Sequence, residues 1–175
     1  GEVRLLTPEK GVSAGIVSVS RHHPHTILIS MNQRDRTAFD VYRLDLRSGK
    51  APLDTQNPGH VVSWVADFEQ NVRAALVVDP AEGEKRLIAR AAVDKPWKTL
   101  RSWTALESGG PVAFSRDGKS ILVLGNKGSD KLRLYALVVD DPATTEIYTN
   151  PKADLSDVEI NPDDRRIEAV STEHV

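Results

Sequence analysis

The segment Gly11-Val-Ser-Ala-Gly15 matches the pattern G-x-S-x-G, which in many hydrolases places a nucleophilic serine on a tight turn between a strand and a helix. The helix is essential to that arrangement, because it presents backbone amides to the oxyanion that forms during acyl transfer. Here the next residues, Ile16 to Ser20, have the composition of a strand, and Pro24 ends the segment. We therefore interpret the pattern as a loop that enters a strand, without a catalytic serine.

The segment Arg21-His-His-Pro-His25 brings three imidazole side chains together, and imidazole is a common ligand of zinc. A dedicated tetrahedral site would need further ligands, and the chain has no cysteine to supply thiolates. The repeat described below places these residues in a turn between two strands. We expect adventitious metal binding at most, and no functional metal or other cofactor.

The segment Ser115-Arg-Asp-Gly-Lys119 is similar to the Asp-box of sialidases, but its aspartate and glycine are adjacent, whereas that pattern separates them. We expect an Asp-Gly turn in which the Asp117 side chain accepts hydrogen bonds from nearby backbone amides.

Four charged residues gather in the most individual loop of the sequence: Arg34, Asp35, Arg36 and Asp40. They fit a salt-bridge network that fixes a hairpin. Alternatively, one of the charges faces a central cavity and contacts the ends of a substrate. No other set of serine, histidine and carboxylate residues has an interpretable arrangement, so we expect no catalytic residue in this chain.

The elements that must position these residues recur at a regular spacing. Apolar runs end at Asn32, Asp79, Asn126 and Thr172, which are 47, 47 and 46 positions apart. Short strands with turn residues between them, repeated every 40 to 50 residues or so, are typical of the four-stranded blades of a β-propeller. The runs Ile27-Leu-Ile29 and Ile121-Leu-Val-Leu124 are apolar on both faces, which indicates strands that neighbouring blades cover on both sides.

The predicted fold is therefore all-β: a propeller segment of about three and a half four-stranded antiparallel blades, truncated at both ends. We predict strands at 14–20, 26–32, 39–46 and 50–55 in the first complete blade. The predicted parts of the chain are the last strand of a preceding blade at 1–8, blades at 12–57, 60–107 and 109–150, and a half blade at 154–175.

Composition narrows the class of protein further. The chain has 23 basic and 25 acidic residues and a net charge of -2 without long like-charge runs, so we expect no nucleic-acid partner. No apolar run approaches the 18 or so residues of a membrane span, so we expect no membrane partner. The absence of cysteine fits both cytoplasm and periplasm, of which we favour the cytoplasm. The only methionine is Met31, and we interpret Gly1 as an internal cut.

The sequence resembles the N-terminal propeller of serine peptidases of the prolyl oligopeptidase family, in particular its acylaminoacyl-peptidase and dipeptidyl-peptidase-like members. The resemblance runs through nearly the whole chain and is carried mainly by these segments: Leu6-Thr-Pro8, His23-Pro24, Asn32-Gln-Arg-Asp35, Asp40-Val-Tyr-Arg-Leu-Asp-Leu46 and Ser48-Gly49. The segment Phe114 to Lys119 resembles a blade motif that these propellers share with TolB-like ones.

The resemblance implies a non-catalytic region that covers the active site of a C-terminal α/β-hydrolase domain and admits short peptides. The catalytic triad of the family lies in that domain, so no catalytic residue is carried over to this chain. The implied partners are peptide substrates of the parent enzyme, the hydrolase domain and the remaining blades. Two alternatives stay open: a TolB-like interaction scaffold without activity, and a scaffold that closes its ring by self-association.

Overall fold

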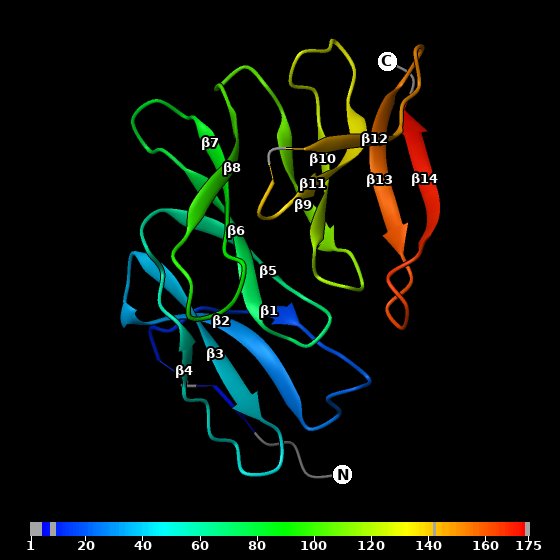
Figure 1. The fold of residues 1–175 in the computed structure, drawn as a ribbon. Coiled ribbons are helices and arrows are strands. Elements are labelled where there is room, and N and C mark those ends of the chain that lie inside the picture. Colours follow the sequence, from blue (N-terminus) through cyan, green and yellow to red (C-terminus); the bar gives the residue numbers. More distant parts are fainter. Residues whose placement is uncertain (1–4, 8–9, 142, 174–175) are drawn as a thin grey trace. The chain divides into compact units, whose positions relative to one another are not determined.

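The computed structural model describes residues 5–7, 10–141 and 143–173, and these contain fourteen strands and no helix (Figure 1). The strands form three four-stranded sheets and one two-stranded sheet, and consecutive strands are neighbours in each. Neighbouring strands run antiparallel, as in the pairs β1–β2, β6–β7, β10–β11 and β13–β14. This arrangement confirms the predicted all-β, propeller-like class. The described residues include no helix long and apolar enough to cross a membrane.

The chain forms two compact units, Gly1–Val61 and Val62–Val175. The first unit holds the sheet with the order β1-β2-β3-β4. Its strands are β1 (Ala14–Ser18), β2 (Thr26–Asp35), β3 (Ala38–Asp45) and β4 (Leu53–Thr55).

The strands of the first sheet lie where the sequence predicts them, with shifted ends. β2 continues to Asp35, because this residue pairs with Ala38 across the hairpin. β4 begins only at Leu53, after Pro52, whose nitrogen cannot donate to a ladder. One apolar face of this sheet carries Ile29 and Tyr42, which are direct partners across the ladder between β2 and β3.

The predicted strand at 1–8 lies mostly outside the described residues. Its described part, Leu5 to Thr7, is not in a strand, and Leu6 packs against the apolar face of the first sheet. The further division of the chain into blades at 12–57, 60–107, 109–150 and 154–175 stays a prediction.

The second unit contains the other three sheets. The first of them comprises β5 (Val61–Ala66), β6 (Val72–Val78), β7 (Lys85–Ala89) and β8 (Lys98–Trp103). The next comprises β9 (Gly109–Phe114), β10 (Ser120–Gly125), β11 (Arg133–Val138) and β12 (Thr144–Tyr148). The last is the pair β13 (Asp154–Ile160) and β14 (Ile167–Glu173).

The sheet β9–β12 is covered on both faces, as the apolar run in β10 predicts. Ile121 and Val123 belong to an apolar cluster with residues of β6, β7 and β8. Their neighbour Leu122 belongs to a second cluster with Leu155 and Val158 of β13. Successive residues of a strand point to opposite faces, so this run supplies a core on each side.

Two glycines allow Trp103 to close the gap between two sheets. Gly109 and Gly125 are partners in the ladder between β9 and β10. A Cβ atom on Gly109 would overlap the indole of Trp103, and one on Gly125 would lie 2.9 Å from the hydroxyl oxygen of Tyr135. Only residues without a side chain let the indole, which is 1% exposed, pack this closely.

The predicted turns carry the expected glycine conformations. Gly49, Gly83 and Gly128 have positive φ values of 73°, 71° and 71° at the turns that precede or follow the third strands. In the first of these turns Asp45 accepts hydrogen bonds from the amides of Arg47 and Ser48 through Oδ1, at 2.9 and 2.7 Å. These bonds help to lower the pKa of Asp45, the bonds to Ser48 contributing most.

Candidate functional site

The G-x-S-x-G segment lies in a loop followed by a strand, as predicted. The exposed Ser13 donates its backbone amide to Asn32 Oδ1 at 2.7 Å, and β1 begins at the next residue. The two residues together fix the entry of the loop into the sheet, and no helix follows to present amides to an oxyanion.

The histidine-rich segment lies in the turn between β1 and β2, also as predicted. The His25 ring nitrogen Nε2 is 2.5 Å from Nη2 of Arg47, so a cationic donor faces the lone pair that a metal would use. Within the described residues no three histidine, aspartate or glutamate side chains are grouped as metal ligands.

The Asp-Gly turn forms between β9 and β10. Asp117 Oδ1 accepts hydrogen bonds from the Ser115 hydroxyl at 2.7 Å and from the Lys119 amide at 3.1 Å. These bonds lower the pKa of Asp117, with the Ser115 hydroxyl as the largest cause. Gly118 has a φ of 67°, which confirms the interpretation as a turn.

The charged loop forms the hairpin between β2 and β3. Asp40 is completely buried, and its two oxygens accept hydrogen bonds from Nε of Arg34 at 2.6 Å and from Nη2 at 3.0 Å. This bidentate contact also raises the pKa of Arg34. Asp35 instead accepts bonds from the amide and hydroxyl of Thr37 at the tip, and these bonds lower its pKa.

Arg36, the last of the four charged residues, is at the tip of the hairpin. Its backbone oxygen accepts a hydrogen bond from Asn32 Nδ2 at 3.2 Å. A Cβ atom placed on Gly11 would lie 3.5 Å from both terminal nitrogens of Arg36, so its guanidinium covers this glycine. The structure thus brings Arg34 and Asp40 into direct contact and places Asp35 and Arg36 at the tip.

Asn57 completes this group, and the sequence interpretation missed it. Its amide donates to Asp40 Oδ1 at 2.8 Å, and its side chain donates to the Phe39 carbonyl at 3.2 Å. Asn57 Oδ1 in turn accepts a bond from the Gly59 amide at 2.8 Å. Both oxygens of Asp40 are therefore occupied by protein groups. The sequence did contain a signal that could have pointed to Asn57: the pair Asn-Pro recurs after an outer strand, at Asn57 and again at Asn150.

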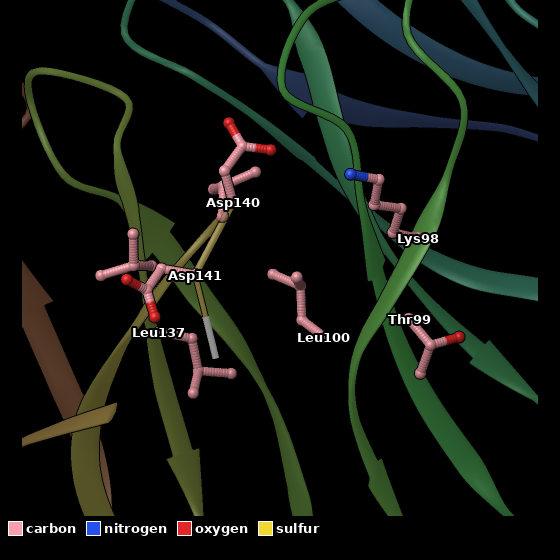
Figure 2. Close-up of a pocket in the computed structure, with 8 residues that line it drawn as sticks. Lys98, Thr99, Leu100, Leu137, Asp140 and Asp141 are labelled. Carbon is pink, nitrogen blue, oxygen red and sulfur yellow. The ribbon is translucent and has the colours of Figure 1, made fainter. Parts of the chain in front are cut away.

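A separate pocket of about 220 Å³ lies in the second unit, and its lining includes the residues labelled in Figure 2: Lys98, Thr99, Leu100, Leu137, Asp140 and Asp141. Charged side chains surround an aliphatic floor. The Asp141 carboxylate accepts a hydrogen bond from the Ala143 amide at 2.9 Å. The lining of this pocket has no serine, cysteine or histidine, so it supplies neither a serine or cysteine nucleophile nor an imidazole base.

Comparison with known proteins gives relatives among the peptidases, although no family model matches the chain. The chain is 26% identical over 177 residues to dipeptidyl aminopeptidase BIII of Pseudoxanthomonas mexicana, which covers 100% of this chain and 25% of the relative. It is 24% identical over 179 residues to dipeptidyl peptidase family member 6 of Caenorhabditis elegans, and this match covers 96% of this chain and 24% of the relative. The chain thus spans about a quarter of the length of the curated relatives it matches.

Two solved structures have a similar fold. TolB from Acinetobacter baumannii has a TM-score of 0.58 at 12% identity, over 86% of this chain and 35% of TolB. A structure from an analysis of two prolyl endopeptidases has a TM-score of 0.54 at 16% identity, over 84% of this chain and 23% of that one. These likenesses establish the fold, while the sequence relatives connect it to peptidases. The blade-sized repeat, the antiparallel sheets and the relatives together show a β-propeller-like segment that is similar to the propeller regions of peptidases of the prolyl oligopeptidase family.

Proposed function

We propose that this chain is the non-catalytic propeller region of a serine peptidase that hydrolyses short peptides, and that it controls access to a C-terminal α/β-hydrolase domain. The observation that carries the proposal is the similarity to dipeptidyl aminopeptidase BIII, because it extends over 100% of this chain. In the proposed enzyme the nucleophilic serine belongs to the hydrolase domain, and this chain forms part of the wall of the channel that leads to it.

The packing of the sheets supports a role as a wall. The sheet β9–β12 has an apolar cluster on each face, and its buried residues Phe114, Ile121 and Val123 are fully shielded from solvent. Such tightly packed sheets resist local opening, because any separation exposes both cores. The channel of a propeller is also narrow compared with a folded domain, so it would pass short peptides and exclude folded proteins.

Labelling of the intact protein with a fluorophosphonate probe tests the catalytic part of this proposal. We expect an intact mass that corresponds to several hundred residues more than this chain, and one labelled serine that lies outside this chain. A short protein that remains unlabelled while hydrolysing no peptide would contradict the proposal.

A series of substrates of increasing length tests the gating part. We expect kcat/KM to fall steeply between short peptides and folded proteins, whereas an unfolded variant of the same protein substrate should be cut slowly. Equal rates for short peptides and folded proteins would rule out gating by the propeller.

The partners in this proposal are the remaining blades, the hydrolase domain and peptide substrates, and no cofactor is needed. Without its neighbours, the 175-residue chain exposes apolar side chains such as Ile16, at 72%, and Val19, at 62%. Exposed apolar surface favours association. We expect sedimentation velocity to show self-association of the isolated chain, and a monomer at all concentrations would argue against it.

For the hairpin of Arg34, Asp35, Arg36 and Asp40 we propose a structural role. The support is the complete burial of Asp40, which keeps its carboxylate away from a substrate, and the use of both its oxygens by Arg34 and Asn57.

A second candidate is a TolB-like interaction scaffold without enzymatic activity. The fold likeness to TolB over 86% of this chain favours it. The labelling experiment separates the two candidates, because a scaffold has no reactive serine to modify.

A further inference from the structure

The turns between the first and second strands of the three sheets in the second unit share an unusual backbone conformation. Gln70, Gly118 and Arg165 occupy these turns, with φ values of 58°, 67° and 62°. Glycine adopts this left-handed conformation readily, but a residue with a Cβ atom is strained there. Strain retained at a turn points to a role for the side chain, so the arginine at this position needs an explanation.

The turn between β13 and β14 holds Arg165 firmly. The Asn161 amide donates to the Arg166 carbonyl at 2.8 Å, and the Arg165 amide donates to the Asn161 carbonyl at 2.9 Å. Asn161 Oδ1 also accepts bonds from the amides of Asp163 and Asp164, at 2.8 and 3.2 Å. The turn therefore fixes the backbone of Arg165 and with it the direction of its Cα–Cβ bond.

The Nε atom of Arg165 is buried and has no hydrogen-bond partner among the described residues. Burial lowers the pKa of Arg165, and the negative charge of Asp67 opposes this lowering without cancelling it. A buried guanidinium nitrogen that gains no acceptor is costly, and an anion bound at the same guanidinium would offset part of that cost by its charge.

Asp67 cannot fully satisfy Arg165, because its oxygens already have other donors. Oδ1 accepts bonds from the amides of Glu69 and Asn71, at 3.0 and 2.9 Å. Oδ2 accepts a bond from Arg73 Nη1 at 3.3 Å. The charge of Asp67 is thus shared between two arginines.

A third guanidinium joins this group from the turn between β9 and β10. Arg116 lies over the ring of Phe68, the neighbour of Asp67, with Cζ 5.0 Å from the ring centroid. Arg73 lies over the ring of Phe114 at the same distance, next to Gly118, where a Cβ atom would be 2.6 Å from its Nη1. All three turns lie at the same end of the second unit (Figure 1).

Other charged groups in these turns are engaged locally. Asp117 accepts bonds from Ser115 and Lys119, as described above, and Asp164 pairs with Arg166 at 3.2 Å. The remaining carboxylates in the turns are Glu69 and Asp163.

We propose that Arg165 and Arg116 bind a carboxylate of a peptide, either an acidic side chain or the C-terminus. The planar guanidinium matches a carboxylate in a bidentate contact, and Arg116, which is exposed, can turn toward the ligand. The choice of a peptide as ligand rests on the proposed function, whereas the carboxylate site itself rests on the three turns.

Titration calorimetry of the intact protein with glutarate, and with its uncharged diamide, tests the site directly. We expect glutarate to bind and the diamide not to bind. Arg165→Gln and Arg116→Gln should each weaken glutarate binding at least tenfold, about the value of one charge-assisted hydrogen bond. Arg166→Gln is the matched control, because it removes the same charge from the next residue, and it should change binding less than twofold.

Arg165→Gly separates loss of the site from loss of the fold. Glycine relieves the strained φ, so this variant should melt at an equal or higher temperature and still lose glutarate binding. Unchanged binding in Arg165→Gly, equal loss in Arg166→Gln, or tighter binding of inorganic phosphate than of glutarate would each overturn the carboxylate assignment.

Kinetics then test the ligand as a substrate. We expect Arg165→Gly to lower the ratio of kcat/KM between a glutamate-containing peptide and its glutamine isostere, and to leave the glutamine peptide unchanged. An unchanged ratio would overturn the peptide as ligand. A protein that binds glutarate but hydrolyses no peptide would overturn the proposed function while leaving the carboxylate site in place.

Discussion

The sheets β9–β12 and β1–β4 have the same strand order and the same apolar second strand, but their surroundings differ. In β10, Ile121 and Leu122 point to opposite faces and are both buried, each in its own apolar cluster. In the first sheet, a pocket of about 300 Å³ opens on one face and is lined by Ile16, Ile27 and other apolar residues. A strand sequence therefore fixes which side chains share a face, and neighbouring sheets decide whether that face is covered.

The two sheets also differ in how their hairpins are held. The first sheet anchors its β2–β3 hairpin with the buried Asp40, which Arg34 and Asn57 contact. The sheet β9–β12 is held instead by apolar contacts and by the close approach of Trp103 to Gly109. Substitutions in the two sheets should therefore have different costs.

The largest expected effect is that of Phe114→Ala. The ring is fully buried between two sheets, so its loss should destabilise the second unit by about 3–5 kcal/mol. Ile16→Ala, in the exposed face of the first sheet, should change stability by less than about 0.5 kcal/mol. Urea unfolding followed by tryptophan fluorescence measures the first effect, because all three tryptophans lie in the second unit. Similar costs for both variants would remove the distinction between the sheets.

Gly118→Ala should destabilise the second unit by about 2–3 kcal/mol, from the left-handed φ and from displacement of Arg73. Gly128→Ala is the matched control, because its φ is 71° and nothing lies within 4 Å of its added Cβ. It should cost only about 1 kcal/mol. Equal costs in urea unfolding would mean that Arg73 moves aside without loss.

Asp40→Ala should destabilise the first unit by about 2 kcal/mol, since the Asn57 amide loses a buried acceptor. Asp35→Ala, at the exposed tip, should have a smaller effect. Because the first unit has no tryptophan, far-UV circular dichroism measures this change. If the two variants unfold at the same urea concentration, the buried contact does not anchor the hairpin.

The smallest expected effect on stability is that of Tyr135→Phe, and it should appear at alkaline pH. Burial raises the pKa of Tyr135 above its usual 10.0, so the folded state keeps the proton to higher pH than the unfolded state. The resulting stability is complete below about pH 10 and is lost as the pH rises through the folded pKa. Tyr135→Phe should therefore flatten the decline of melting temperature above pH 10. An equally steep decline in the variant would assign it to other groups.

Much of the fold could be predicted from the sequence because its signals are local. The repeat of apolar runs located β2, β6, β10 and β14, and glycines such as Gly49 and Gly118 marked turns with positive φ. The ends of strands were less predictable. β2 runs on to Asp35 because of its pairing with Ala38, and that pairing depends on the hairpin register.

The sequence by itself determined the strands, their alternation and the turns, because each depends on residues only a few positions apart. The tertiary structure alone decided which distant groups meet. Asn57 reaches Asp40 across 17 positions, and Arg165 comes within range of the Asp67 charge from another sheet. Arg165 also adopts the left-handed conformation, with a positive φ, that glycine has in the corresponding turn at Gly118. Such contacts depend on the packing of whole sheets, and local propensity carries no record of that packing.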